Sequence, residues 1–372
     1  MQSRIAGRAS AEATNDYLER HAAGARGRTL AGARLSSIGI GTYLGEDSAD
    51  NDALYREAIE TALDSGINVI DTAINYRSQR SERTIGEALR AALDKGSVKR
   101  EEVLVASKAG YLPSDGERPR SRREFESHVQ KTYFEPGIMK PEEFVSGCHC
   151  MAPRYLEDQL ERSRTNLGLD TIDVYYVHNP ETQFDAVDRA GFLSRLKSAF
   201  ELLEGAARDN RIGVYGTATW NGFRVPPAKS GHLSLEEIVQ VARSVGGSDH
   251  HFKVVQLPYN LAMPEAHEQR TQSLNGNMVT LLEAAKELGV YVMASASLLQ
   301  GQLTERLPDE LRSTLGLRTD AQRALQFVRS TPGIGTALVG MKSKQHVLDA
   351  REVERTKPLD ADTVQSLFDN AG

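Results

Sequence analysis

Apolar runs and amphipathic segments alternate along most of this chain. Runs rich in branched aliphatic residues predict strands, and they lie at 35–41, 67–70, 103–107, 172–177, 212–217, 252–256, 290–294 and 335–339. Between them, apolar residues recur at helical spacing, as in Ile85, Ala88, Leu89 and Ala92. The strand runs hardly alternate between apolar and polar residues, so both of their faces are expected to be buried, as in a parallel sheet covered by helices.

Eight strand-then-helix units predict a closed (β/α)8 TIM barrel, in which the chemistry lies at the carboxyl ends of the strands. The alternative is an open doubly wound sheet, which needs a glycine-rich turn directly after a strand. Gly39-Ile-Gly41 is the nearest candidate, but the third glycine and a helix at the right distance are missing. Helices are expected to begin at Pro153, at the capping box Ser234-Leu-Glu-Glu, and near Met278 and Lys344.

Two segments depart from this alternation. Residues 1–30 are rich in Ala, Gly, Arg and Glu without sustained apolar periodicity, which predicts a loosely attached arm before a barrel domain at 31–372. Residues 111–150, between the third strand and its helix, carry several prolines and many charges. A loop of this length in a compact domain is usually functional or disordered. Because it leaves from a strand end, we expect it to form a lid or a substrate wall at the barrel mouth.

Charge and cysteine content narrow the class of protein. The 372 residues carry a net charge of -6, which offers no attraction to nucleic acid or to an anionic membrane. No apolar run is long enough to span a bilayer, and residues 1–27 contain no signal-peptide core. Two cysteines in a chain of this size favour a reducing compartment. We therefore expect a cytoplasmic protein that binds neither nucleic acid nor membrane.

Ionisable side chains close three consecutive strand runs. Asp71 ends the second run and is followed by Tyr76, Lys108 ends the third, and His178 ends the fourth. A charge inside a barrel is costly unless it is paired, so these positions suggest a proton-transfer site. Each residue also has a plainer interpretation. Asp71 and Lys108 could be a structural ion pair, Tyr76 a packed loop aromatic and His178 a buried histidine, and only the joint arrangement favours chemistry.

The segments Asp71-Thr-Ala-Ile-Asn-Tyr76, Ala106-Ser-Lys108 and Val177-His-Asn-Pro180 resemble the Asp/Tyr/Lys/His tetrad of the aldo-keto reductases. The resemblance runs from about residue 35 to 350 and implies an NADPH-dependent enzyme that reduces an aldehyde or ketone, with Tyr76 as general acid. A free phenol has a pKa of about 10, and each unit of downward shift corresponds to about 1.4 kcal/mol. Lys108 is expected to lower the pKa of Tyr76, Asp71 to hold Lys108, and His178 to orient the substrate carbonyl.

The resemblance also implies cofactor contacts. Gly41, Thr42 and Tyr43, with Asp71, would lie at the nicotinamide, and Gln256 would hydrogen-bond its carboxamide. Where the family has Ser-Asn after the fifth strand, this chain has Ala218-Thr219, so only Thr219 could keep a hydrogen bond. Where the family has an aromatic residue after the seventh strand, this chain has Ser295, which leaves Trp220 or Tyr259 as a substitute for stacking.

The residues expected to bind the phosphate of the cofactor follow the last strand. Gly340-Met-Lys-Ser343 opens a helix whose N-terminus favours an anion, and Lys342 adds a positive charge. By resemblance this segment holds the 2'-phosphate of NADPH, with a further contact at His346, which favours NADPH over NADH. The adenine-contacting Asn of the family falls at Ala350. The alternative for Lys342 is a solvated surface lysine.

The remaining expectations concern a metal, the alternative functions, and the substrate and oligomeric state. Cys148-His-Cys150 lacks a second ligand pair and the usual zinc spacing, so no metal is expected. A redox sensor or partner subunit with little turnover is an alternative function, and so is an enzyme with a transient internal redox step, such as an epimerase or lyase. The substrate is expected to be a small-molecule carbonyl, and the protein a monomer or small homo-oligomer.

Overall fold

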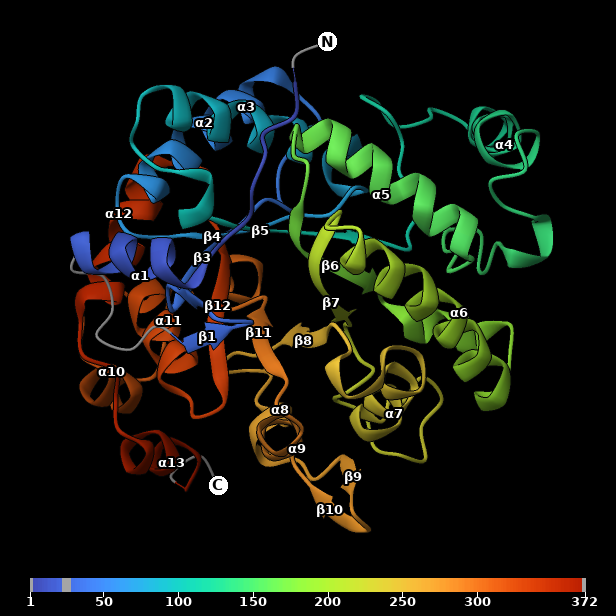
Figure 1. Cartoon of the computed structure of the whole chain (residues 1–372). Coiled ribbons are helices and arrows are strands. Elements are labelled where there is room, and N and C mark those ends of the chain that lie inside the picture. Colours follow the sequence, from blue (N-terminus) through green and yellow to red (C-terminus); the bar gives the residue numbers. More distant parts are fainter. Residues whose placement is uncertain (1–2, 22–27, 370–372) are drawn as a thin grey trace.

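Eight parallel strands close into a barrel at the centre of the molecule (Figure 1). The computed structural model describes residues 3–21 and 28–369. The barrel strands are β3 (Ile38–Gly41), β4 (Val69–Asp71), β5 (Leu104–Ala109), β6 (Ile172–His178), β7 (Ile212–Ala218), β8 (Phe252–Pro258), β11 (Tyr291–Ser295) and β12 (Ile334–Gly340). β12 pairs with β3 and closes the ring. The predicted (β/α)8 TIM barrel is therefore confirmed.

One helix follows each barrel strand and covers its outer face (Figure 1). These helices are α2 (Ala49–Leu63), α3 (Arg80–Asp94), α5 (Pro153–Leu167), α6 (Arg189–Arg208), α7 (Leu235–Gly246), α9 (Leu281–Leu288), α11 (Asp320–Ser330) and α12 (Lys344–Arg355). Pro153 is the first residue of α5, and Ser234 caps α7 by accepting from the backbone N–H of Glu237, both as expected. The further α-helices in the described residues are α1 (Ala11–Arg20), α4 (Arg122–Val129), α8 (Glu265–Glu268), α10 (Asp309–Leu315) and α13 (Ala361–Asp369). Two hairpins pair β1 (Arg28–Leu30) with β2 (Ala33–Leu35) and β9 (Gln272–Leu274) with β10 (Asn277–Val279).

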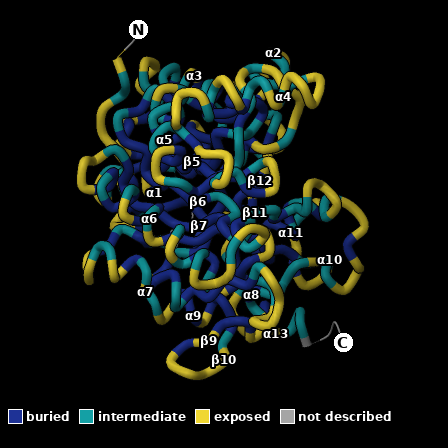
Figure 2. Tube along the Cα trace, turned by 90° about the vertical axis from the view of Figure 1, so that its right-hand side faces the viewer, coloured by how far each residue is buried: buried dark blue, intermediate teal, exposed yellow. Residues whose placement is uncertain are grey.

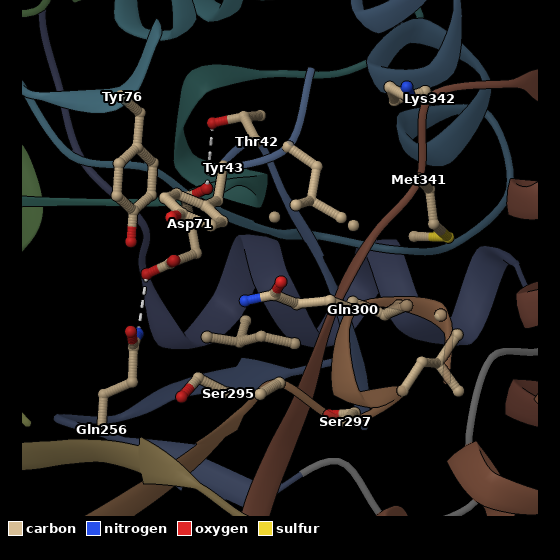
Figure 3. A pocket seen from close by; sticks show the side chains of 18 of the residues that line it. Thr42, Tyr43, Asp71, Tyr76, Gln256, Ser295, Ser297, Gln300, Met341 and Lys342 are labelled. Carbon is tan, nitrogen blue, oxygen red and sulfur yellow. Dashed lines mark hydrogen bonds between the residues drawn. The ribbon is translucent and has the colours of Figure 1, made fainter. Parts of the chain in front are cut away.

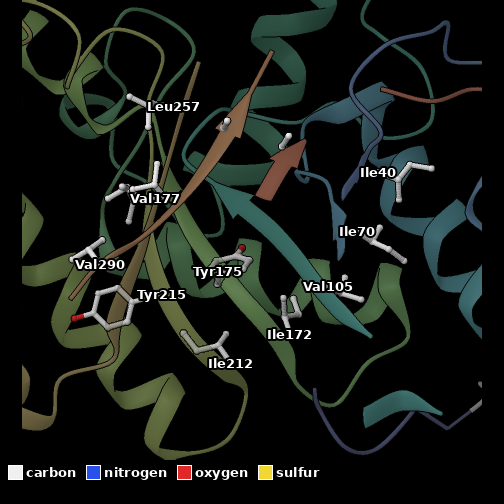
Figure 4. Packing of buried hydrophobic residues seen from close by; sticks show 14 of the residues in the cluster. Ile40, Ile70, Val105, Ile172, Tyr175, Val177, Ile212, Tyr215, Leu257 and Val290 are labelled. Atoms are coloured by element: carbon white, nitrogen blue, oxygen red, sulfur yellow. The ribbon is translucent and has the colours of Figure 1, made fainter. Parts of the chain in front are cut away.

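Alternate residues of each strand face two different cores. Outward-facing residues such as Ile70, Val105 and Ile172 pack against the helices (Figure 4). Inward-facing residues form a second cluster inside the barrel: Val69, Leu104, Ala106, Val174, Tyr176, Val214, Ala218, Val254, Met293 and Leu338. Both faces of the strands are buried, which explains why the sequence runs do not alternate (Figure 2).

The register of the parallel strands brings their carboxyl ends to one level. Gly41 pairs with Gly340 on one side and with Asp71 on the other. Across the barrel, Ala218 pairs with His178 and with Gln256. Polar residues that are far apart in sequence therefore meet at one mouth of the barrel.

The N-terminal arm is closely packed, and the prediction of a loose attachment was wrong for the residues described. Helix α1 begins after the cap Ser10 and buries Tyr17, whose hydroxyl donates to the Leu63 carbonyl at 2.5 Å. The backbone N–H of Ala9 donates to Asp173 at 2.6 Å, at the amino end of the barrel. The few apolar residues of the arm are enough because they enter an existing core. Residues 1–2 and 22–27 lie outside the described part.

The 111–150 segment folds beside α5 (Figure 1). Its helix α4 continues into a π-helical turn at Gln130–Phe134, where Tyr133 is buried with its ring 5.6 Å from that of Tyr155 on α5. Among the described residues of the segment, Tyr111 is the one that lines the central cavity. The rest of the segment does not line this cavity, so its role as a lid or a substrate wall stays a prediction.

Two expected boundaries differ. The first barrel strand begins at Ile38 because Leu35 belongs to the β1–β2 hairpin, which packs into the cluster inside the barrel. The helix expected from Met278 begins at Leu281, since Thr280 forms a capping box with Glu283 and residue 278 lies in β10. In the described chain no helix combines the length and apolar character needed to cross a bilayer.

Candidate active site

Strand alternation places the predicted site residues on the inner face of the barrel. Each follows, two positions later, a residue of the inner apolar cluster: Asp71 after Val69, Lys108 after Ala106, His178 after Tyr176, and Gln256 after Val254. Successive side chains of a strand point to opposite faces, so a spacing of two returns to the same face. The four polar side chains form the last inward layer at the carboxyl ends.

Asp71 and Lys108 form a buried ion pair. Lys108 Nζ donates to Asp71 Oδ2 at 2.7 Å and to the carbonyl of Thr72 at 2.7 Å. The other carboxylate oxygen, Oδ1, accepts from the Gln256 side-chain amide at 2.8 Å. Burial lowers the pKa of Lys108, and the charge of Asp71 opposes that shift. The ammonium is thus held in a fixed place by a partner charge and a carbonyl dipole.

Tyr76 lies above this pair. Its ring centroid is 5.1 Å from Lys108 Nζ, and in Figure 3 its hydroxyl points toward Asp71 and Gln256. Burial raises the pKa of Tyr76 well above its ordinary value, and the negative charge of Asp71 raises it further. The net pKa shift of Tyr76 is therefore upward, opposite to the downward shift expected from Lys108, because burial and the charge of Asp71 dominate. The phenol keeps its proton at neutral pH.

His178 completes the group at the end of β6. Its ring centroid is 6.0 Å from that of Tyr76 and 5.1 Å from that of Tyr111, both edge-to-face. Burial lowers the pKa of His178 well below its ordinary value, and the charge of Lys108 adds to that shift. The imidazole is therefore neutral. Its Nδ1 is buried without a hydrogen-bond partner.

The turn after Tyr76 is strained and tightly held. Arg77, Ser78 and Gln79 have φ values of 48°, 51° and 67°, a region that costs about 1–3 kcal/mol for each non-glycine residue. The buried Arg77 is paired with Asp52, and Ser78 Oγ donates to Asp47 at 2.8 Å. These contacts fix the backbone that carries the phenol.

A cavity of about 850 Å³ extends from this group to the N-terminus of α12 (Figure 3). Its lining includes the predicted residues Gly41, Thr42, Tyr43, Asp71, Tyr76, His178, Thr219, Gln256, Gly340, Lys342 and His346. Lys108 is fully buried beneath it. Figure 3 shows Tyr76 and Gln256 at one end and Lys342 at the other. At that far end Ser343 caps α12 by accepting from the His346 backbone N–H at 3.3 Å.

The residues expected at the carboxamide are already engaged with protein groups. The Thr219 hydroxyl donates to Glu181, and its oxygen accepts from the Gly222 N–H at 2.8 Å. Gln256 donates to Asp71 instead. Of the two proposed stacking residues, Tyr259 is ruled out, because it is buried with its ring stacked 5.6 Å from that of Phe327. Trp220, the other proposed residue, lines the cavity.

Other lining residues were missed as site residues. Tyr111 and Asn179 contact each other, with Asn179 Nδ2 donating to the Tyr111 hydroxyl at 3.1 Å. Asn179 directly follows His178 at the end of β6, and Tyr111 lies two residues after β5, the strand that carries Lys108; this position was the available signal. Gln300, Gln322 and Leu325 line the opposite end, and no pattern in the sequence pointed to them.

Cys148-His149-Cys150 is a structural segment. Both ring nitrogens of His149 are hydrogen bonded, to the His178 carbonyl at 2.7 Å and to the Gln183 side chain at 2.8 Å. Cys150 is buried, and its Sγ accepts from the Ala152 N–H. In the part of the chain that the structure describes, no three His, Cys, Asp or Glu side chains are placed to hold a metal ion.

The chain thus combines a closed (β/α)8 barrel with Asp, Tyr, Lys and His side chains gathered at one mouth. The aldo/keto reductase family model matches residues 37–369, and the chain belongs to this family.

Sequence relatives match over only part of their length. A horse aldo-keto reductase family 1 member C23-like protein and bovine prostaglandin F synthase 1 are each 27% identical over 143 residues, 38% of this chain and 31% of those proteins. Bovine dihydrodiol dehydrogenase 3 is 26% identical over 48% of this chain and 46% of its own length. The chain thus matches less than half of each of these relatives.

Solved structures match over nearly the whole chain. An aldo/keto reductase from Klebsiella pneumoniae in complex with NADP and acetate has a TM-score of 0.59 at 19% identity, covering 91% of this chain and 92% of that one. The holo form of aldo-keto reductase AKR11C1 from Bacillus halodurans has a TM-score of 0.61 at 18% identity, covering 91% and 95%. At these identities the likeness shows the fold.

Proposed function

We propose that this protein is an NADPH-dependent reductase of aldehydes or ketones. The observation that carries the proposal is the buried Lys108–Asp71 pair beneath Tyr76 and beside His178, at one end of a long cavity. Family membership and the complex of the Klebsiella pneumoniae relative with NADP support it. The Lys108–Asp71 pair alone would not support the proposal, since a buried ion pair can also be a purely structural feature.

The cavity fits an extended dinucleotide with a phosphate at one end. Gly41 and Gly340 lie side by side on its wall and leave room for a flat group. At the far end the N-terminus of the 12-residue α12, Lys342 and His346 favour an anion, as a 2'-phosphate requires. When bound, NADPH supplies the hydride for the carbonyl carbon.

The residues of the chain supply the proton and the orientation. Tyr76, protonated at neutral pH, donates its proton to the carbonyl oxygen as negative charge develops there. The neutral His178 ring N–H donates a hydrogen bond to the same oxygen. Lys108 stabilises the phenolate that is left, and Asp71 holds Lys108 in place. Tyr43, Tyr111 and Trp220 also line the cavity and offer aromatic surface to a small carbonyl substrate.

The protein is proposed to act in the cytoplasm as a monomer or small homo-oligomer. Cys148 and Cys150 are free thiols, which suits a reducing compartment. The barrel is closed, so its sheet presents no edge that a partner must cover.

Tyr76→Phe tests the assignment. The variant should bind NADPH as the wild type does, measured by fluorescence titration, and should reduce a panel of aldehydes and ketones about 10²- to 10⁴-fold more slowly. A variant that reduces carbonyls at the wild-type rate would remove Tyr76 from the mechanism. Tight NADPH binding by a wild type without turnover would favour the redox-sensor alternative instead.

A further inference from the structure

The carbonyl of His178 lies where the hydrogen bonding between β5 and β6 stops. The last paired residues of these strands are Ala109 and Val177, so the ladder offers His178 no partner on β5. The next residue, Asn179, turns away with φ of 44°. A buried carbonyl without a donor costs about 1–3 kcal/mol and leaves the peptide free to rotate.

A side chain from the 111–150 segment fills this gap. The segment returns to the barrel through a short antiparallel pairing, with Leu112 N–H donating to Cys148 O at 2.8 Å and Cys150 N–H donating to Gly110 O at 2.9 Å. This pairing brings His149, which is fully buried, to the end of β6. Its Nε2–H donates to the His178 carbonyl at 2.7 Å. His149 thus extends the ladder by one hydrogen bond.

The tautomer of His149 is set by a chain of side chains behind it. The Gln183 amide N–H donates to His149 Nδ1 at 2.8 Å, so the ring proton must be on Nε2. Arg195 donates to the Gln183 oxygen at 2.5 Å, which fixes the orientation of that amide. Burial lowers the pKa of His149 to about 4, so the ring is neutral. The three hydrogen bonds therefore run in one direction, from Arg195 through Gln183 and His149 to the His178 carbonyl.

Gly110 leaves room for the hydrogen bond between His149 and the His178 carbonyl. A Cβ added there would lie 2.7 Å from His149 Nε2 and 2.7 Å from the His178 oxygen, which is too close for either atom. The Tyr111 ring packs edge-on against both imidazoles, with centroids 5.3 Å and 5.1 Å away. The glycine, the histidine and the tyrosine form one unit around His178.

We propose that His149 is a positioning residue for His178, and that fixing the His178 peptide through the His149–Gln183–Arg195 chain is a function of the 111–150 segment. This inference rests on the proposed function, because it assigns the position of an imidazole that touches the substrate. Orienting that imidazole matters since a displacement of about 1 Å in an active site can cost about a hundredfold in rate.

Two substitutions at His149 separate positioning from packing. His149→Gln places an amide N–H near Nε2 and keeps the donor, whereas His149→Phe keeps the ring volume and removes it. We expect His149→Phe to lower kcat by about tenfold to a hundredfold at unchanged NADPH affinity, and His149→Gln to stay within about threefold of the wild type. His128→Phe, at a half-buried histidine in the same segment, is the matched control and should leave kcat unchanged. The proposal is overturned if His149→Phe retains kcat, or if both His149 variants lose it equally.

Gly110→Ala tests the same hydrogen bond without touching either histidine. Its control is Gly116→Ala, because Gly116 also has positive φ and has open space around its Cβ position. Gly110→Ala should lower kcat as His149→Phe does, and Gly116→Ala should not. If the two alanine variants behave alike, the hydrogen bond is not what matters.

A readout independent of turnover separates this inference from the proposed function. In ¹⁵N–¹H NMR spectra of the wild type, His149 should show the Nε2–H tautomer, and the His178 ring signals should move in His149→Phe but not in His128→Phe. An Nδ1–H tautomer or unmoved His178 signals would overturn the inference. If the wild type did not reduce carbonyls, the proposed function would fail, but the inference about His149 and His178 would not.

Discussion

Lys108 Nζ and Asp71 Oδ2 are 2.7 Å apart at the floor of the cavity, where Lys108 is fully buried and Asp71 nearly so. The same ammonium lies near the face of Tyr76, and the same carboxylate accepts from Gln256. One ion pair therefore connects β4, β5, β8 and the loop that carries the phenol.

Removing both partners of this pair should destabilise the protein by less than the two single removals added together. Lys108→Met or Asp71→Asn should each lower the free energy of unfolding by about 3–5 kcal/mol, because a buried charge or polar group is left unpaired. The double variant should lose less than the sum of the two. Urea unfolding of the four proteins gives the coupling energy. The exposed pair Arg122–Glu126 is the control and should show a coupling below about 1 kcal/mol. Additive losses at 71 and 108 would contradict a tight pair.

The rate of carbonyl reduction should not fall between pH 7 and about 10. Because burial raises the pKa of Tyr76 above its ordinary value, the phenol keeps its proton throughout this range. His178 stays neutral in the same range, since its pKa is lowered. The measurement is kcat at saturating NADPH against pH. A decline centred near pH 8 that disappears in Tyr76→Phe would show instead that Lys108 outweighs burial and Asp71 in setting the pKa of Tyr76.

Glu181 should control the position of Trp220. Its Oε1 accepts from the backbone N–H groups of Trp220, Asn221 and Gly222 at 3.1, 3.2 and 3.3 Å, and from the Thr219 hydroxyl. Glu181→Ala removes all four bonds and should release this loop. Trp220 is the only tryptophan, so its fluorescence should shift to longer wavelength and be quenched more by acrylamide.

The control for that experiment is Glu265→Ala. Glu265 is also an acid bound to this loop, but it pairs with the Arg224 side chain rather than with backbone N–H groups. Its variant should leave the Trp220 emission close to that of the wild type. Equal shifts in the two variants would show that the loop responds to any lost charge.

Tyr17→Ala should destabilise the barrel although the residue lies in the N-terminal arm. The side chain is fully buried and donates to the Leu63 carbonyl, so its loss should cost about 3–5 kcal/mol in the free energy of unfolding. Asp16→Ala, on the exposed face of the same helix, should cost less than about 0.5 kcal/mol. Equal unfolding curves for wild type and Tyr17→Ala would instead support the prediction that the arm is loosely attached.

Much of the fold could be predicted because the eight strand runs and their helices are local patterns. The position of Asp71, Lys108 and His178 at strand ends was also readable, since a charge that ends an apolar run is visible in sequence. The arm could not be judged in the same way. Tyr17 and Leu18 are two apolar residues in a polar segment, and only the tertiary structure shows that both are buried in the core, with the Tyr17 hydroxyl donating to the Leu63 carbonyl.

By itself, the sequence determined the order of the strands, the barrel they form and which residues can exchange protons, because these depend on local periodicity and on side-chain chemistry. Only the tertiary structure decided which alternate residues face inward, because strands buried on both faces show no polar alternation. It also decided that burial and Asp71 outweigh Lys108 in setting the pKa of Tyr76, and that His149 donates to His178 across 29 residues. Those outcomes depend on distances between segments that are far apart in the sequence, and such distances cannot be read from the order of the residues.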